Sequence, residues 1–284
     1  MERLERVLVQ QGYSNTRGFY SRTTKKGHVQ SEKVWSALAQ ENPIDAAAAT
    51  NSTDWYAKYP HVIEQEIQDE EKLALDAGCG YGRVAIPLLR GRRKLKLIGV
   101  DASPVMLNTF SHLVETESAI PLKQRLILLH SPINQLPFPE ATFDYIYSCA
   151  VLLHNPYRDV RDILDEFNRL LKPTGKLILA GSFPNVFNLE GLQNYIYSSW
   201  LIPADANGPV RAYTRHKIKR LFVDWNEVQI LPKGVTVLPR QIAKIPLPLG
   251  PCVRRVNGWF EEKNFRVLPR SSLFIKYFDV VAQK

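Results

Sequence analysis

Short apolar runs of strand length recur through the middle of the chain, and stretches of helical periodicity lie between them. The runs cover residues 73–77, 95–100, 125–129, 143–149 and 176–180. Runs this short, bounded by turn-forming residues, are typical of strands buried on both faces. Strands that alternate with helices predict a largely parallel sheet covered by helices on both sides. We therefore expect a doubly wound α/β fold.

Capping and breaking residues mark the ends of the predicted helices. Ser103 predicts the start of a helix that runs to about residue 113. Apolar residues at helical spacing over 159–171 predict a longer helix, which Pro173 and Gly175 end. Residues 81–89 also fit a helix, although Pro87 should strain or end it.

The pattern loosens on both sides of this central region. Residues 1–60 are mixed in character, with one helix predicted from Ser31 to Ala39. The helices expected after residue 183 are 189–200, 214–222 with Thr214 as its cap, and 254–263. Strands are expected at 228–231 and 273–282, and a proline-rich loop over 232–251.

The first apolar run ends in a turn with three glycines, Gly78, Gly80 and Gly82, directly after Asp76. Glycine lets the backbone approach a ligand closely, because no Cβ intervenes. The N-terminus of the following helix offers unpaired N–H groups and a positive dipole to a carboxylate. Asp76 can accept a hydrogen bond from an ammonium group. A ligand that carries an amino-acid group matches both charges.

Two other interpretations of this turn stay open. A dinucleotide-binding turn requires G-x-G-x-x-G, but here the third glycine comes one position early and Arg83 follows it. The turn could also be purely structural. Asp101, which ends the second apolar run, could bind the two hydroxyls of a ribose or cap the next helix.

Four segments together resemble the class I S-adenosylmethionine (SAM)-dependent methyltransferases. Residues 75–82 resemble the first motif of that family and residues 99–107 the second. Residues 136–145 are similar to the approach to the family's fourth strand, and residues 170–177 to the entry to its fifth. The resemblance implies a Rossmann-like, mostly parallel sheet of seven strands whose last strand is antiparallel.

The same resemblance implies a methyltransferase domain at 61–284, preceded by a helical cap or lid at 1–60. Insertions at about 183–212 and 232–263 would shape the acceptor site, because SAM binding alone does not require them. They point to a moderately sized, partly apolar small molecule, methylated at O, N or C. The alternatives are an RNA or tRNA methyltransferase and a SAM-binding protein without catalysis.

By this resemblance, Asp76, Gly78, Cys79 and Gly80 would hold the methionine part of SAM, and Asp101 the ribose. Two further residues would lie near the adenine or the ribose, Ala102 and Met106. No metal site is expected, since the cysteines and histidines show no ligand spacing.

The adenine contact departs from the family pattern. Pro132 stands where the family often has an acidic residue that accepts the adenine amino group. The backbone near Ser131 or Ile133, or the side chain of Asn134, would take over that contact. The segment around Tyr56 resembles the N-terminal lid element that carries a tyrosine over the cofactor.

His154 follows the fourth predicted strand, at the carboxyl edge where open α/β sheets bind ligands. Histidine suits proton abstraction near neutral pH, and methyl transfer needs a base when the acceptor must lose a proton. His154 is therefore the candidate general base. The alternative is a loop histidine that only packs or caps.

Composition and charge bound the remaining possibilities. No apolar run is long enough for a membrane span, and the N-terminus lacks the apolar stretch of a secretory signal, so we expect a cytoplasmic protein. The net charge is +9, and residues 201–284 hold 15 Lys and Arg against 6 Asp and Glu. This basic part could attract an anionic partner. Nucleic acid is possible but not favoured, because aromatic residues that could stack on bases are sparse there.

Overall fold

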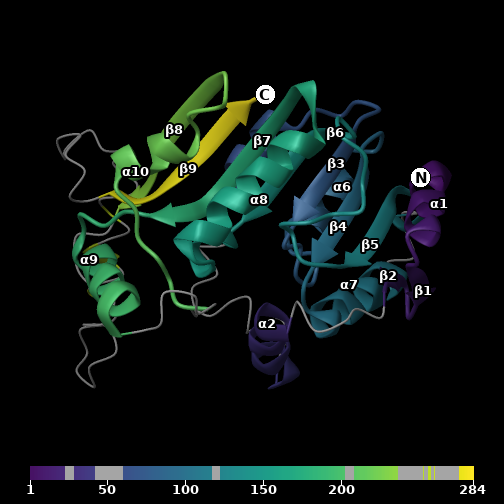
Figure 1. Cartoon of the computed structure of the whole chain (residues 1–284), viewed down its shortest axis with the longest axis horizontal. Helices are drawn as coiled ribbons and strands as arrows, with labels where there is room; N and C mark the ends of the chain where they lie inside the picture. The colour runs from purple at the N-terminus through teal and green to yellow at the C-terminus, as the bar shows by residue number, and fades with distance from the viewer. Residues whose placement is uncertain are drawn as a thin grey trace.

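A nine-stranded sheet with helices on both faces forms the centre of this computed structural model (Figure 1). The structure describes residues 1–22, 29–41, 60–116, 122–201, 208–235 and 275–284, together with residues 252, 255, 256 and 259. The strands are β1 (Ser14–Thr16), β2 (Phe19–Ser21), β3 (Leu73–Ala77), β4 (Lys96–Asp101), β5 (Leu126–His130), β6 (Phe143–Cys149), β7 (Leu171–Pro184), β8 (Glu227–Val235) and β9 (Ile275–Gln283).

The helices alternate with the strands along the chain, as the sequence predicts. They are α1 (Glu2–Gln10), α2 (Val29–Glu41), α5 (Pro60–Glu66), α6 (Ala85–Gly91), α7 (Pro104–Thr116), α8 (Tyr157–Leu170), α9 (Leu189–Ile196) and α10 (Arg215–Leu221). Three short helical turns join them, η1 (Leu122–Arg125), η2 (Leu152–His154) and η3 (Tyr197–Leu201). No helix among the described segments is both long and apolar enough to cross a membrane.

In space the strands follow the order β1-β2-β5-β4-β3-β6-β7-β9-β8. Five consecutive strands in this order form a parallel block, β5, β4, β3, β6 and β7. The last strand, β9, is antiparallel to both β7 and β8. The α/β class and the antiparallel last strand are thus confirmed.

The expected count of seven strands is wrong, because a hairpin near the N-terminus adds two more. Strands β1 and β2 are joined by Arg17 and Gly18, which both have positive φ, 60° and 84°. Two such residues give the turn that matches the twist of a two-residue hairpin. Tyr20 of β2 then pairs with Leu129 of β5. Part of the expected helical cap therefore extends the sheet instead.

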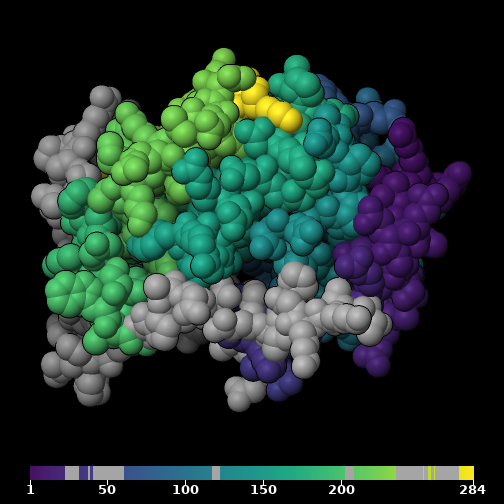
Figure 2. All heavy atoms as spheres, viewed as in Figure 1, coloured from purple at the N-terminus to yellow at the C-terminus, as the bar shows by residue number. Residues whose placement is uncertain are grey.

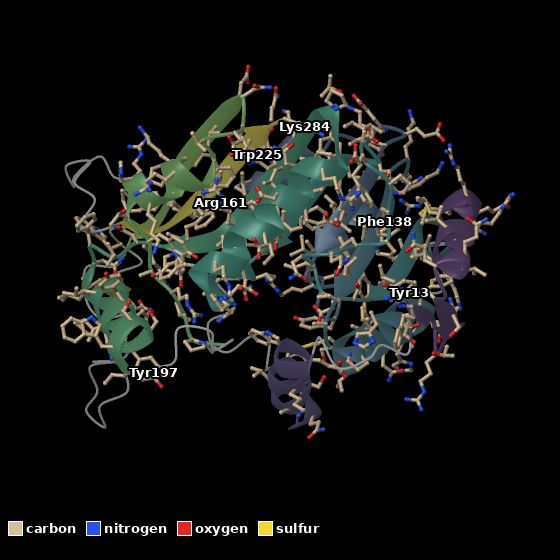
Figure 3. All side chains as sticks on the ribbon, viewed as in Figure 1. Tyr13, Phe138, Arg161, Tyr197, Trp225 and Lys284 are labelled. Atoms are coloured by element: carbon tan, nitrogen blue, oxygen red, sulfur yellow. The ribbon has the colours of Figure 1, made fainter. Side chains whose placement is uncertain are left out.

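Two hydrophobic cores lie on the two faces of the sheet, because side chains alternate along each strand. Leu75 and Ala77 face the core that contains the apolar side of α8. Ala74 faces the opposite core, which contains residues of α5, α6 and α7. Phe138 and Trp225, from segments far apart in the sequence, pack into the α8 core (Figure 3).

Local capping signals are confirmed at two helices. The Ser103 hydroxyl accepts a hydrogen bond from Met106 N at 3.3 Å, and the Thr214 hydroxyl accepts one from Lys217 N at 3.0 Å. Helix α6 begins later than predicted, at Ala85. Pro87 consequently falls in its first turn, where a missing N–H costs no intrahelical hydrogen bond.

Candidate functional site

The three glycines of the turn after β3 have different surroundings: two lie against side chains, and one faces open space. Gly78, Gly80 and Gly82 all have positive φ, 81°, 53° and 86°. A Cβ on Gly78 would lie 2.4 Å from the Val151 side chain, and one on Gly82 would lie 2.4 Å from the Phe110 ring. A Cβ on Gly80 would meet no atom of the protein within 4 Å. Close approach to a ligand is therefore possible at Gly80.

Asp101 joins this turn to the turn after β4. Its Oδ2 accepts a hydrogen bond from Gly80 N at 2.8 Å, and its Oδ1 accepts one from Ser103 N at 2.8 Å. Burial raises the pKa of Asp101, while these backbone donors oppose that shift. Each carboxylate oxygen can accept a second hydrogen bond, so ribose hydroxyls still have acceptors here.

The backbone N–H groups of Gly78 and Cys79 are already engaged inside the sheet. Both donate to the carbonyl of Val100, at 2.8 and 2.9 Å. Burial raises the pKa of the Cys79 thiol well above its usual value, so the thiol stays protonated. These two residues can therefore offer a ligand only their carbonyl oxygens and the shape of the turn.

Asp76 has a buried carboxylate oxygen whose hydrogen-bonding requirement is unfilled. Its side chain is 2% exposed, and its Oδ2 has no hydrogen-bond partner among the residues that the structure describes. Burial raises the pKa of Asp76 to about 7, although the nearby Tyr147 hydroxyl and Arg83 lower it. An unpaired buried carboxylate is costly. An ammonium group bound beside Gly80 would supply its partner, which fits a ligand with an amino-acid end.

Residues expected near the adenine gather beside Asp101. The carbonyl of Ala102 lies 3.1 Å from His130 Nε2, and Ser131 N donates to Asp101 O at 3.2 Å. Met106 is buried in the first turn of α7. Ile133 is partly buried against the α8 core. His130 itself was not predicted, although its place at a strand end could have revealed it.

Helix α2, which lies within the segment 1–60 expected to form a cap or lid, lies across the ends of three strands. The Ser36 hydroxyl is 3.1 Å from the Ser103 hydroxyl after β4. Glu32 Oε2 is 3.7 Å from His130 Nε2 at the end of β5. Trp35 contacts His154 after β6, with ring centroids 4.9 Å apart.

The three contacting residues of α2 are spaced i, i+3 and i+4, so they share one face of the helix. That spacing is the signal that would have identified α2 as a cover over the strand ends (Figure 1). The other predicted lid residue, Tyr56, lies outside the described residues.

His154 sits in η2, directly after β6, and its protonation state follows from its contacts. Its Nδ1 is 2.7 Å from the carbonyl oxygen of Gly208. A carbonyl only accepts, so Nδ1 must carry the proton, and Nε2 keeps a lone pair. Burial of the ring, opposed by the hydrogen bond to Gly208 and assisted by the charge of Arg211, lowers the pKa of His154 to about 4. His154 is thus a neutral acceptor at neutral pH.

Comparison with known proteins identifies the class to which this arrangement belongs. Residues 75–179, from β3 into β7, match a protein family of methyltransferase domains. This stretch is a methyltransferase domain, and its motifs are those that resemble the class I, SAM-dependent enzymes. A demethylmenaquinone methyltransferase of Bacillus cereus is 36% identical to it over 133 residues, which are 46% of this chain and 53% of that protein. The chain therefore spans about half the length of the curated relatives that it matches.

Solved structures with low sequence identity share the fold of this methyltransferase domain. One is a phosphoethanolamine N-methyltransferase of Haemonchus contortus, in complex with phosphomonomethylethanolamine and S-adenosylhomocysteine. It has a TM-score of 0.58 and 14% identity, and the match covers 93% of this chain and 61% of that one. Another is a SAM-dependent methyltransferase of Methanosarcina mazei, with a TM-score of 0.53, 16% identity and coverage of 79% and 97%. The cofactor of the domain is SAM, and no group of residues in the described ranges could hold a metal ion.

The affinity of the methyltransferase domain for SAM should depend on pH through Asp76. Only the ionised carboxyl attracts the ammonium group of SAM, and its pKa in the free protein is about 7. Binding below pH 7 must therefore displace a proton, and affinity should fall about tenfold per pH unit from 7 to 5. Above about pH 8 the amino group of SAM loses its own proton, which weakens binding again. Calorimetric titration from pH 5 to 9 measures this profile.

The matched control for this profile is Asp76→Asn, which removes the titrating group at nearly constant volume. Its SAM affinity should be low and independent of pH between 5 and 7. The ligand-free variant should be more stable than the wild type at pH 8, because a raised carboxyl pKa destabilises the folded state as pH increases from about 4 to 7. A wild-type affinity that stays constant between pH 5 and 7 would show that Asp76 does not bind the cofactor.

Proposed function

We propose that this protein transfers a methyl group from SAM to a small-molecule acceptor. The observation that carries the proposal is the buried, unpartnered Oδ2 of Asp76, one strand away from the acceptor oxygens of Asp101. This spacing provides an anionic partner for an ammonium group and acceptors for ribose hydroxyls at one edge of the sheet. The relative in Bacillus cereus, named for its action on demethylmenaquinone, supports a small-molecule acceptor.

In this proposal the cofactor would be held by the turn from Asp76 to Gly80 and by Asp101, with Ala102 and Ser131 beside the adenine. SAM supplies a methyl group on a sulfonium, which transfers to a nucleophile held in line with it. The chain's own contribution is alignment, exclusion of water and removal of a proton. Trp35 and the rest of α2 would limit the access of water.

His154 is the proposed base. Its Nε2 lone pair, set by the hydrogen bond from Nδ1 to Gly208, can accept a proton from an acceptor hydroxyl or amine. The low pKa keeps this nitrogen unprotonated throughout the physiological range. It also makes His154 a weak base, which suits acceptors that are already acidic, such as a phenol, better than an aliphatic alcohol.

Titration calorimetry and methyl-transfer assays test the function in two steps. SAM and S-adenosylhomocysteine should bind with low-micromolar affinity, and at one hundred times Kd they should raise the free energy of unfolding by about 2.7 kcal/mol. Radiolabel from SAM should then enter low-molecular-weight metabolites. A melting temperature unaffected by millimolar SAM would contradict cofactor binding. Label recovered only in RNA would show that the acceptor is RNA and not a small molecule.

A further inference from the structure

The large exposed hydrophobic residues concentrate on one short stretch of the chain. Twelve such residues are exposed in the described part of the protein, and eight of them lie between residues 187 and 201. We call these eight the apolar patch: Phe187, Leu189, Leu192, Tyr195, Ile196, Tyr197, Trp200 and Leu201. Trp200 is 80% exposed and Leu201 70%. Contiguous apolar surface of this kind marks an interaction site more often than isolated exposed residues do.

Helix α9 carries much of the patch, and its apolar side faces solvent while its polar side faces the protein. Its inward side is polar or small: Asn188 and Gly191 are buried. Asn188 Oδ1 accepts a hydrogen bond from Gly191 N at 2.7 Å, and its Nδ2 donates to the carbonyl of Ile275 in β9 at 2.8 Å. Gly191 lies so close to the Asn185 carbonyl that any Cβ there would overlap it. The helix is thus held to the sheet by polar contacts, and its apolar side faces outward.

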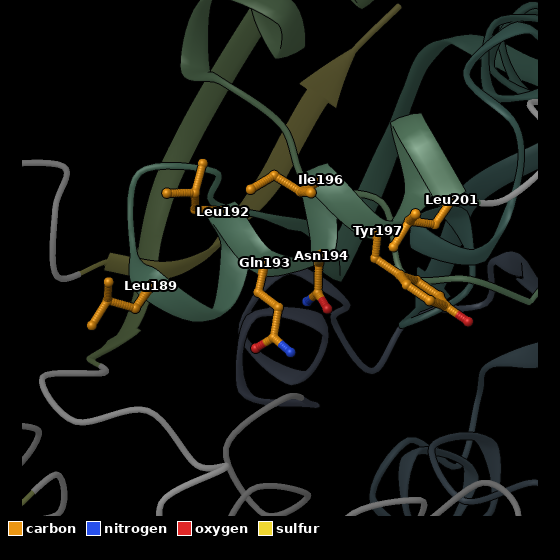
Figure 4. A pocket seen from close by; sticks show the side chains of 7 residues that line it. All are labelled: Leu189, Leu192, Gln193, Asn194, Ile196, Tyr197 and Leu201. Atoms are coloured by element: carbon orange, nitrogen blue, oxygen red, sulfur yellow. The ribbon is translucent and has the colours of Figure 1, made fainter.

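The outward side also forms a shallow hollow. Its volume is about 550 Å³, and Figure 4 shows the side chains that project around it. They are Leu189, Leu192, Gln193, Asn194, Ile196, Tyr197 and Leu201. Tyr197 lies at the outer end of α9, on the side away from the sheet (Figure 3). The mixture of aliphatic side chains with Tyr and Trp is typical of segments that lie in a membrane–water interface.

Positive charge adjoins the patch and decides between its possible occupants. Asn185, just before α9, forms a bridge with Tyr213, just before α10, and both helices lie at the same end of the molecule (Figure 2). Arg215, Lys219 and Arg220 of α10 are exposed. With a net charge of +9, a second copy of the chain would be repelled, whereas an anionic surface would be attracted.

The patch is also connected to the methyltransferase site by the backbone. The segment that follows it returns along η2, where Gly208 N donates to His154 O at 3.1 Å and Arg211 N donates to Leu153 O at 2.8 Å. One end of the insertion therefore carries the apolar surface, and its other end contacts the turn that holds the proposed base. An acceptor that enters beside the patch would approach the strand ends on the side of His154.

We propose that the apolar patch inserts into the surface of a bilayer that contains anionic lipid, and that the acceptor is an apolar molecule dissolved in that bilayer. The second half of this inference rests on the proposed methyltransferase function, but the first half does not. Membrane binding can be measured without SAM or turnover. A failure of membrane binding can therefore be distinguished from a failure of the proposed methyl transfer.

Vesicle co-sedimentation of the full chain tests membrane binding. The protein should bind vesicles of phosphatidylcholine with 30% phosphatidylglycerol about tenfold or more better than pure phosphatidylcholine, and salt should weaken this preference. Trp200 fluorescence should shift to the blue on binding. The variant Leu189→Ser, Trp200→Ser, Leu201→Ser should lose most of the binding, since all three side chains are exposed and their removal leaves the core intact.

The matched control is Val9→Ser, Val223→Ser, which removes two equally exposed apolar residues outside the patch, 61% and 69% exposed. Its vesicle binding should equal that of the wild type. Equal binding of the patch variant and the wild type would overturn the proposal, as would absence of wild-type binding to either vesicle. A wild-type dimer in sedimentation velocity that the patch variant disrupts, without vesicle binding, would assign the patch to self-association instead.

Discussion

Gly80→Val is expected to abolish SAM binding while leaving the ligand-free protein folded. A Cβ at this position meets no protein atom within 4 Å, so the valine side chain would project into the space that the methionine part of the cofactor requires. Gly80 has a φ of 53°, which a branched residue adopts at a cost of roughly 1–2 kcal/mol. We therefore expect at least a hundredfold loss of affinity by calorimetry, with a decrease of only a few degrees in Tm.

Two glycine variants separate cofactor exclusion from general damage. Gly91→Val introduces the same side chain where it also meets no atom within 4 Å and where φ is not positive, so it should bind SAM normally. Gly82→Val would collide with the Phe110 ring and should destabilise the fold itself. Normal SAM binding by Gly80→Val would mean that the cofactor lies elsewhere.

His154→Ala should lower turnover by roughly a hundredfold to ten-thousandfold, the usual span for loss of a general base. SAM affinity should change little, because the proposed cofactor contacts come from β3, β4 and the turns that follow them. The pKa of His154 is about 4, so the wild-type rate should stay constant as pH falls from 7 to about 5 and decline only below that. Initial rates over pH 4–9, with saturating SAM, measure both effects.

Two further histidine variants distinguish a base from a packing residue. His154→Asn can still donate a hydrogen bond to the Gly208 carbonyl, because its amide nitrogen replaces Nδ1. It has no basic nitrogen, so it should be as slow as His154→Ala while keeping the wild-type Tm. His112, an exposed residue of α7, provides the control, and His112→Ala should retain full activity. Near-normal turnover of His154→Asn would show that alignment of the acceptor suffices for catalysis.

Elements governed by local sequence were predictable. The parallel strands β3 to β7 were visible as apolar runs, because a strand covered on both faces has no polar side. Caps at Ser103 and Thr214 were visible because a capping hydroxyl contacts a backbone N–H only two or three residues away. The glycine-rich turn and Asp101 could also be selected as candidate cofactor residues, because each stands directly after an apolar run; their role stays a prediction.

The hairpin at residues 14–21 shows how a weak local signal was missed. Arg17 adopts a positive φ that arginine rarely takes, so its turn does not resemble the usual Asn-Gly pair. The hairpin is held in place by pairing with β5, more than one hundred residues later in the chain. A contact at that distance leaves no local pattern, so the sequence predicts no strand here and places the segment within the expected helical cap.

The sequence by itself determined the alternating strands and helices of the central region, the order of their motifs and the residues of the proposed cofactor turn. Only the tertiary structure decided that Asp76 keeps an unpartnered oxygen, that Trp35 of α2 covers His154, and that α9 turns its apolar side outward. Each of these depends on which distant segments pack together. The pKa values of Asp76 and His154 and the exposure of α9 arise from that packing, because the whole fold decides which sites water can reach.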